Sequence, residues 1–176
     1  MRKLANEELD RKSIEEFKEA DKIPVSIFLD NVRSLNNVGS AFRTSDAFLI
    51  EKIYLGGITG TPPHREIQKT ALGATESVAW EHVPEPLPFL KGLQANGYKI
   101  ISIEQAENST SLLDFTPDKS EKYCLVFGNE VFGVDQEIVS ASDVVIEIPQ
   151  FGTKHSLNIS VSLGVVIWEF YKNLSA

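Results

Sequence analysis

The sequence predicts an α/β fold built on a parallel, doubly wound sheet. Six short apolar runs typical of strands alternate along the chain with segments of helical spacing, an order that favours parallel strands covered by helices on both faces. The 176 residues, 42% of them hydrophobic, are enough for one compact core. We find no internal repeat and no low-complexity linker. The sequence therefore indicates a single α/β domain.

The predicted elements follow one another in a regular order. Residues 1–22 are charge-rich with sparse apolar positions, which predicts an N-terminal helical extension in front of a main domain of residues 23–176. The predicted strands are 25–29, 52–55, 78–82, 98–104, 122–127 and 144–148. Helical spacing predicts helices at 36–48, 65–71, 88–96, 135–141 and 157–171. A Gly/Pro-rich loop at 56–63 separates the second strand from the second of these helices.

The single cysteine and the placement of charged residues indicate where in the cell the protein is expected. Cys124 is the sole cysteine and lies in an apolar run, so no intramolecular disulfide can form and a buried, unreactive thiol is expected. Charged residues occupy the place where a signal peptide needs an apolar stretch. The most apolar late segment, 159–171, contains polar residues and is shorter than the about 20 apolar residues of a membrane span. We therefore expect a cytoplasmic protein without a membrane span.

Charge is distributed unevenly along the chain. The net charge of −8 argues against indiscriminate binding of nucleic acid, which depends on clustered Lys and Arg. Between residues 31 and 75, however, five basic and three acidic residues give a local charge of +2, which leaves −10 elsewhere. This pattern predicts a local basic face on an acidic body, able to recruit phosphate at one place.

Unusual residues follow three of the predicted strands, where ligands bind in open α/β sheets. The segment 31–43 follows the first strand and places Asn36 or Asn37 at a helix start, where Asn36 could be an N-cap. Arg43 borders the predicted buried face of that helix, where an unpaired guanidinium would be costly. A phosphate or carboxylate partner is therefore expected for Arg43.

The other two segments are 128–133, after the fifth strand, and 148–158, after the sixth. The first reads Gly-Asn-Glu-Val-Phe-Gly, and its glycines suggest a backbone that approaches a ligand closely. Neither a P-loop nor Gly-x-Gly-x-x-Gly occurs, which argues against nucleotide hydrolysis and Rossmann dinucleotide binding. Glu130 could instead be a helix-start carboxylate, and Ser156 a cap of the last helix.

Histidine and tryptophan positions have structural interpretations. His64, His82 and His155 lack the spacing of metal ligands, so no metal site is expected. Trp80 and Trp168 fall on apolar strand and helix patterns, which predicts that both are in the core.

Taken in order, the three segments resemble the three motifs of the SpoU/TrmH family of RNA ribose 2′-O-methyltransferases, within the SPOUT superfamily. Residues 36–46 are similar to the first motif, 125–133 to the second, and 146–161, with its Ile-Pro and Ser-Leu-Asn pieces, to the third. Residues 69–74 and 103–105 also resemble family features, so the resemblance covers roughly 23–174.

The resemblance implies a C-terminal trefoil knot, S-adenosylmethionine as cofactor, and a homodimer in which first-motif residues complete the partner's pocket. The cofactor contacts that it implies are Ile103, Gly128, Ile148, Ser156 and Leu157. The catalytic set that it implies is Arg43, Asn36, Glu130, Ser156 and Asn158. Because a guanidinium hardly deprotonates, we do not expect Arg43 to act as a base. We expect it to bind the adjacent phosphate and to stabilise the developing alkoxide. RNA phosphates are expected to contact Arg33, Arg65 and Lys69.

The expected substrate is structured RNA. Only about 24 residues precede the first strand, which favours tRNA over an RNA that needs a separate recruiting domain. Three alternatives stay open: a ribosomal RNA 2′-O-methyltransferase, a non-catalytic RNA-binding or assembly factor with the same knotted dimer, and a methyltransferase of small molecules. The first retains the chemistry, whereas the others lack methyl transfer or lack RNA.

Overall fold

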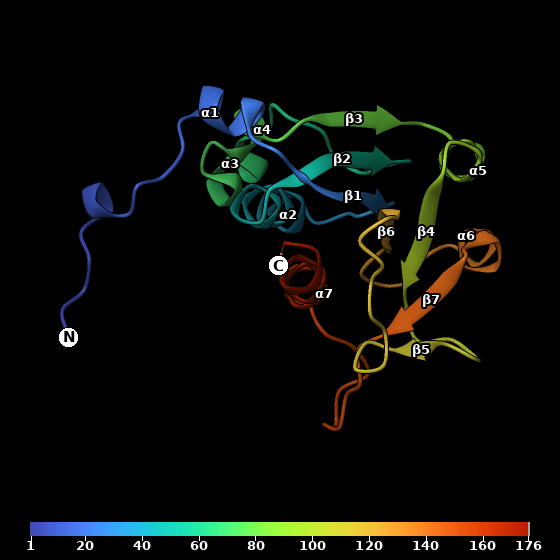
Figure 1. Ribbon diagram of the computed structural model, residues 1–176. Helices are drawn as coiled ribbons and strands as arrows, with labels where there is room; N and C mark the ends of the chain where they lie inside the picture. The colour runs from blue at the N-terminus through green and yellow to red at the C-terminus, as the bar shows by residue number, and fades with distance from the viewer. Residues whose placement is uncertain (176) are drawn as a thin grey trace.

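A computed structural model describes residues 1–175. Its centre is one seven-stranded sheet in which every pairing is parallel, in the order β3-β2-β1-β6-β4-β7-β5 (Figure 1). The strands are β1 (Ile23–Asp30), β2 (Ile50–Gly56), β3 (Trp80–Val83), β4 (Tyr98–Ile103), β5 (Thr110–Ser111), β6 (Lys122–Phe127) and β7 (Val144–Glu147). The parallel sheet and its six predicted strands are confirmed. The additional strand β5 has two residues, too few to produce a hydrophobic pattern.

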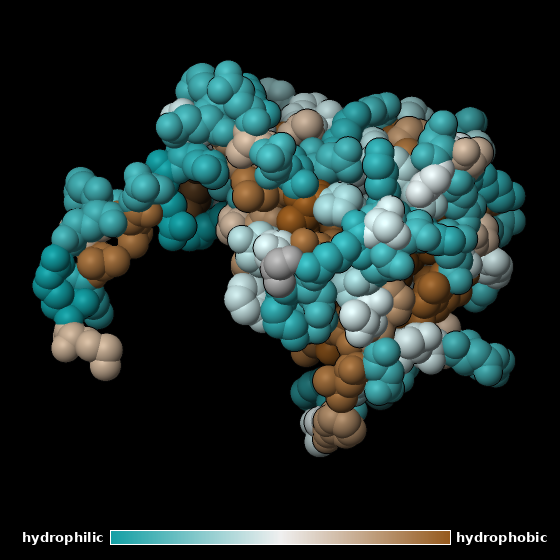
Figure 2. Space-filling view, viewed as in Figure 1, coloured by the Kyte–Doolittle hydropathy of each residue, from teal (hydrophilic) through white to brown (hydrophobic). Residues whose placement is uncertain are grey.

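Helices connect the strands at the predicted places. They are η1 (Asn6–Glu8), α1 (Ile14–Glu19), α2 (Leu35–Ala47), α3 (Arg65–Ala71), α4 (Ala74–Ser77), α5 (Pro86–Ala95), α6 (Gln136–Ala141) and α7 (Ile159–Leu174). The short α4 was not predicted. Residues before α1 extend away from the body as a mostly hydrophilic arm (Figures 1 and 2). The last residue of the predicted main domain, 176, lies outside the described residues.

The core has two parts, one on each face of the sheet, because successive strand residues point to opposite faces. Ile27 and Leu29 pack with α2, α3 and α7, whereas Phe28 packs with α5 and α6. Figure 1 shows these two groups of helices on opposite sides of the strands. Cys124 is fully buried in the second part, as predicted, and burial raises the pKa of its thiol.

Strand order places the functional segments together. β6 lies between β1 and β4, and β7 lies between β4 and β5, although β4 and β5 precede both along the chain. The register aligns Phe127 with Leu29 and Ile103, and Ile103 with Ile146. The segments that leave β1, β6, β4 and β7 therefore emerge side by side at one edge of the sheet.

Both tryptophans are more exposed than predicted. Trp80 is 36% exposed because β3 is an edge strand, and Trp168 is 53% exposed on α7. Val161 and Val165 are exposed along the same helix at 51% and 41%. Their spacing places all three on one face of α7, so the prediction of two core tryptophans was wrong.

Residues 1–175 contain neither a membrane-spanning helix nor a cluster of metal-binding side chains. No helix in this range combines the length and apolar character needed to cross a membrane. The same range contains no group of three or more His, Cys, Asp or Glu side chains placed to hold a metal ion.

Candidate functional site

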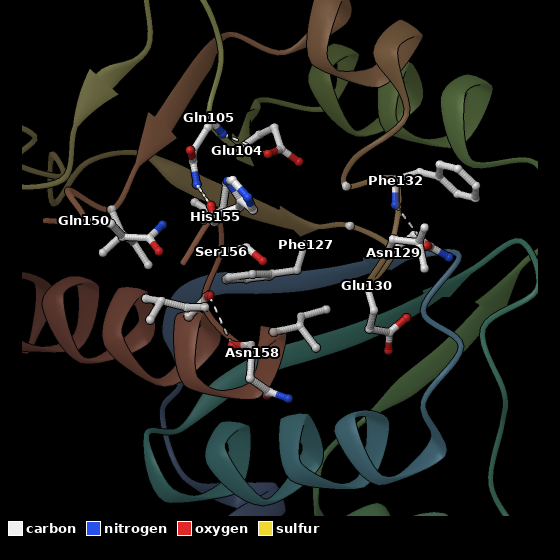
Figure 3. Close-up of a pocket in the computed structure, with 18 residues that line it drawn as sticks. Glu104, Gln105, Phe127, Asn129, Glu130, Phe132, Gln150, His155, Ser156 and Asn158 are labelled. Carbon is white, nitrogen blue, oxygen red and sulfur yellow. Dashed lines mark hydrogen bonds between the residues drawn. The ribbon is translucent and has the colours of Figure 1, made fainter. Parts of the chain in front are cut away.

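A cleft of about 590 Å³ opens at the edge where these strands end. Its walls are the segments after β4, β6 and β7 and the start of α7 (Figure 3). All five residues predicted as cofactor contacts line this cleft: Ile103, Gly128, Ile148, Ser156 and Leu157. Three segments that are distant along the chain thus form one pocket.

The wall after β6 is a tight turn. Asn129 and Gly133 exchange two backbone hydrogen bonds of 2.9 Å, and the Asn129 Oδ1 atom accepts from the N–H groups of Val131 at 2.8 Å and Phe132 at 3.2 Å. A side chain at Gly128 would place its Cβ 2.0 Å from the backbone of Gly133. Gly128 is therefore required by the close approach of two backbone segments.

Glu104 ties the end of β4 to this turn. Its Oε2 atom accepts from Val134 N–H at 3.0 Å, and its Oε1 atom accepts from Gln105 N–H at 2.8 Å. Gly133 has φ +72°, and a Cβ there would lie 2.1 Å from Glu104 Oε2. Sequence reasoning did not assign a role to Glu104, although its place directly after a strand is the available signal.

A second connection crosses from β4 to the third motif. The Gln105 Nε2 atom donates a 2.7 Å hydrogen bond to the carbonyl oxygen of His155, a contact drawn in Figure 3. The segment before α7 projects from the body in Figure 1, and residues 151–157 are all exposed. Gln105 and His155 both line the cleft and were not predicted as site residues.

Glu130 connects the cleft to α2. Its carboxylate accepts from the N–H groups of Arg33 at 3.0 Å and Ser34 at 2.9 Å, and from Asn37 Nδ2 at 3.1 Å. Partial burial pushes the Glu130 pKa upward, but these hydrogen bonds outweigh it, so the pKa lies below its ordinary value.

Glu130 is thus a helix-start carboxylate, but for a helix distant along the chain. The capping prediction for Asn36 was wrong. α2 begins one residue earlier, and Ser34 is its N-cap, accepting from Asn37 N–H at 3.3 Å.

A buried network beneath the turn fixes its position. The Asn129 Nδ2 atom donates to the carbonyl oxygen of Asn31 at 2.7 Å. Asp30, 1% exposed, accepts from Asp135 N–H at 2.9 Å and from Asn31 Nδ2 at 2.9 Å. Burial is the main cause that raises the pKa of Asp30. The end of β1 therefore holds both ends of the segment that follows β6.

Within the third motif, the residue that caps α7 is not the predicted one. α7 begins at Ile159 and its N-cap is Asn158, whose Oδ1 atom accepts from Ser160 N–H at 2.8 Å. The prediction that Ser156 caps α7 was therefore wrong. Ser156 is exposed and lies before the helix, where it lines the cleft together with Asn158.

The predicted catalytic residues divide into two groups. Glu130, Ser156 and Asn158 line the cleft, whereas Asn36 and Arg43 lie outside it on α2. Arg43 is exposed and makes no hydrogen bond or ion pair within residues 1–175. Arg43 borders the buried face of α2, as predicted, because Phe42 and, one turn earlier, Gly39 are buried. The phosphate or carboxylate partner expected for it is not supplied by the described residues of its own chain.

The predicted RNA contacts are exposed. Arg33 precedes α2, and Arg65 and Lys69 lie on α3. Lys69 forms an ion pair of 2.6 Å with Glu66, of the exposed kind that contributes little to stability. Its ammonium can therefore exchange this partner for another anion.

The cleft offers a mixed chemical surface. Ile103, Phe127, Ile148 and Leu157 supply apolar walls, while Gln105 and Ser156 supply polar groups. Half of the eighteen lining residues carry polar or charged side chains. A volume of several hundred Å³ is typical of sites for small molecules and cofactors.

The sequence is similar to RNA methyltransferases over most of its length. The model of the SpoU rRNA methylase family matches residues 24–168. The tRNA (guanosine(18)-2′-O)-methyltransferase of Aquifex aeolicus is 29% identical over 90% of this chain and 74% of its own. The 23S rRNA (guanosine-2′-O-)-methyltransferase RlmB of Neisseria meningitidis is 30% identical over 83% of this chain, which spans 57% of that relative.

The fold is similar to those of solved RNA-modifying enzymes. The TrmH/SpoU tRNA modifying enzyme of A. aeolicus superposes with a TM-score of 0.82 and 28% identity, over 92% of this chain and 81% of that chain. The AdoMet-bound rRNA methyltransferase of Sinorhizobium meliloti has a TM-score of 0.80 and 25% identity, over 90% of this chain and 60% of that chain.

Proposed function

Because this chain belongs to the SpoU rRNA methylase family, we propose that it transfers a methyl group from S-adenosylmethionine to a ribose 2′-hydroxyl of structured RNA. One observation carries the proposal: the five residues expected to contact the cofactor line a single cleft. The structure of the S. meliloti relative, solved with AdoMet bound, supports the same cofactor.

The residues of the cleft fit this cofactor. Gly128 approaches the backbone of Gly133 so closely that a larger residue would displace the turn that lines the cleft. Ile103, Ile148 and Leu157 would hold the adenine, and Ser156 would bond a polar group. When bound, the cofactor supplies an electrophilic methyl carbon on a sulfonium.

The protein has to align the acceptor and stabilise charge. The ribose 2′-oxygen forms the new bond to the methyl carbon while the bond from that carbon to sulfur breaks, and the hydroxyl proton leaves to a phosphate or to water. Arg43 would hold the adjacent phosphate and the developing alkoxide. Glu130 would place α2, which carries Asn36 and Arg43, against the cleft wall. Asn158 would orient the start of α7 beside the ribose.

We propose that the active form is a homodimer. Arg43 has no partner within residues 1–175 and lies outside the cleft of its own chain. α2 packs beside α7, whose exposed face carries Val161, Val165 and Trp168. An apolar stripe of this kind is typical of a contact with another protein surface. A second copy placed there would bring its own Arg43 near this region.

The C-terminal trefoil knot belongs to the same proposal. The interleaved strand order and the bond from Gln105 to His155, which ties the segment before α7 to the end of β4, support it. Location in the cytoplasm stays a prediction.

We propose tRNA as the substrate. The similarity to the tRNA methyltransferase of A. aeolicus, which spans 74% of that protein, supports this choice. Arg33, Arg65 and Lys69 would contact its phosphates. Ribosomal RNA is the second candidate, because the relative from N. meningitidis has 30% identity over 83% of this chain.

The test uses purified protein, radiolabelled S-adenosylmethionine and total RNA from a cell that lacks the gene. tRNA and ribosomal RNA are separated before digestion to nucleosides. Label in a 2′-O-methyl nucleoside of tRNA is the expected result, and label confined to ribosomal RNA would establish the second candidate. Absence of label in every fraction, with cofactor binding intact by calorimetry, would overturn methylation of RNA in favour of a binding factor or a small-molecule acceptor.

Arg43→Ala tests the catalytic assignment in the same assay. We expect methyl transfer to fall by orders of magnitude while cofactor binding and dimer mass are retained, since Arg43 lies outside the cleft. Unchanged transfer would remove Arg43 from the mechanism.

A further inference from the structure

Phe132 lies at the mouth of the cleft with its ring in solvent. It is 84% exposed, although it belongs to a turn that lines the cleft. Figure 3 shows its ring pointing away from Gln105, His155 and Ser156, so it does not form part of the inner wall. A single exposed apolar side chain is common on protein surfaces. The informative features of Phe132 are its place and how firmly its backbone is held.

The backbone of Phe132 is fixed from both sides. Its N–H group donates to Asn129 Oδ1, and the next residue, Gly133, is paired with Asn129 by two backbone hydrogen bonds. Asn129 is itself bonded to the carbonyl oxygen of Asn31. The turn therefore presents the ring from a rigid base, which lowers the entropy lost when a partner stacks on it.

A cation with no intramolecular partner accompanies this ring. Arg33 is exposed, and its guanidinium makes no hydrogen bond or ion pair within the described part of the chain. The Arg33 N–H group donates to Glu130, which precedes Phe132 by two residues, so the backbone of Arg33 is joined to the turn that carries Phe132. An exposed aromatic ring and a free guanidinium on two joined segments match a nucleobase and a phosphate near it.

We propose that Phe132 stacks on a base of the RNA substrate, at or next to the nucleotide that is methylated, while Arg33 binds a neighbouring phosphate. The inference rests on the proposed function, because the acceptor ribose has to reach the cleft that Phe132 borders. On a chain of net charge −8, Arg33 supplies the positive charge that a phosphate of the RNA requires. Stacking tolerates any base, so Phe132 contributes affinity and placement while sequence preference comes from elsewhere.

The experiment compares wild type with Phe132→Ala, Phe132→Leu and Phe132→Trp on total tRNA from the cell that lacks the gene. We expect Phe132→Ala and Phe132→Leu to raise the KM for tRNA about tenfold, because loss of one base stack has about this effect. Phe132→Trp keeps an aromatic face and should keep the wild-type KM. The cofactor Kd should stay within about twofold, since the ring points out of the cleft. Leu113→Ala, which removes another exposed apolar side chain (81%) that does not line the cleft, is the matched control.

Two results would overturn the inference. A Leu variant that behaves like wild type would show that the contact needs an apolar side chain and not an aromatic face. A change of oligomeric mass in Phe132→Ala, measured by sedimentation, would assign the ring to a contact between copies of the chain.

The outcome is separable from that of the proposed function. If wild type labels no RNA, filter binding of the same tRNA to wild type and to the three variants still measures the stack. Weaker retention by Ala and Leu, with Trp restored, then supports RNA stacking without methyl transfer, whereas equal retention by all four proteins overturns it.

Discussion

The Glu130 Oε1 atom accepts a hydrogen bond of 3.1 Å from Asn37 Nδ2, and through it the turn after β6 holds the first turn of α2. The same carboxylate accepts the N–H groups of Arg33 and Ser34. The Ser34 N–H group is one of the donors that a helix start leaves without an intrahelical partner. One carboxylate thus joins the wall of the proposed cofactor cleft to the helix that carries Arg43.

Glu130→Ala is therefore expected to weaken this connection. Loss of a carboxylate at a helix start costs about 1 kcal/mol in the free energy of unfolding, measured by urea titration. Methyl transfer should fall more than cofactor affinity does, because α2 shifts while the remaining cleft contacts persist. Glu107→Ala, which removes an exposed carboxylate outside any helix, should change stability by less than about 0.5 kcal/mol.

The pH dependence of stability gives a second readout of Glu130. Its pKa is lowered in the folded protein, so the stabilisation is present above the ordinary pKa of a glutamate and is lost as the pH falls through the folded value. Glu130→Gln does not titrate and should flatten this part of the profile. An unaltered acid limb in the Gln variant would contradict the assignment.

The sequence allowed the parallel sheet, most helices and the cleft contacts to be predicted, because hydrophobic periodicity and motif order are local signals. The strand order could not be predicted, since insertion of β6 between β1 and β4 depends on contacts between distant segments. The N-cap residues of α2 and α7 were predicted wrongly, because the exact residue at which a helix begins depends on the surrounding structure. Asn36 and Ser156 are good capping residues, but Ser34 and Asn158 lie at the actual helix starts. Glu104 was missed because its partner, Val134, is 30 residues away.

Gly128→Ala tests the close approach within the cleft wall. The new Cβ would lie 2.0 Å from Gly133 and 2.1 Å from the Val134 nitrogen, so the turn has to move. We expect cofactor affinity, measured by calorimetry, to fall about tenfold or more, because a displacement of this kind disturbs the positioned backbone groups. Gly152→Ala is the control, since a Cβ there has no neighbour within 4 Å. Equal affinities for both variants would place the cofactor elsewhere.

Asn158 has two proposed roles that substitution can separate. As N-cap of α7 its Oδ1 atom accepts from Ser160 N–H and Ser160 Oγ, so Asn158→Ala should lose about 1 kcal/mol of stability. Asn158→Ser retains a capping oxygen and should restore thermal stability. If Asn158 also orients the ribose, methyl transfer stays low in the Ser variant. Full recovery of transfer by Ser would limit Asn158 to capping.

The exposed stripe on α7 predicts how the dimer forms. Val165→Lys places a charge between Val161 and Trp168, and burial of an unpaired ammonium is costly, so the dimer should dissociate at micromolar concentration. Sedimentation measures the mass directly. Leu113→Lys introduces the same charge at an exposed apolar side chain outside α7 and should leave the mass unchanged. A dimer that persists in Val165→Lys would move the interface away from α7.

Mixed dimers test whether Arg43 acts in the cleft of its partner. Arg43→Ala keeps an intact cleft but lacks Arg43, whereas Gly128→Ala keeps Arg43 but binds the cofactor more weakly. With the cofactor held well below the Kd of Gly128→Ala, both homodimers should therefore have low activity. In a dimer of one chain of each kind, isolated with two different affinity tags, the cleft of the Arg43→Ala chain receives Arg43 from the other chain. One complete site of two then gives about half of the wild-type activity per dimer. If Arg43 serves its own cleft instead, the mixed dimer contains no complete site and stays as inactive as its parents. Both homodimers are assayed at the same concentration, so that residual activity of Gly128→Ala can be subtracted before the two outcomes are compared.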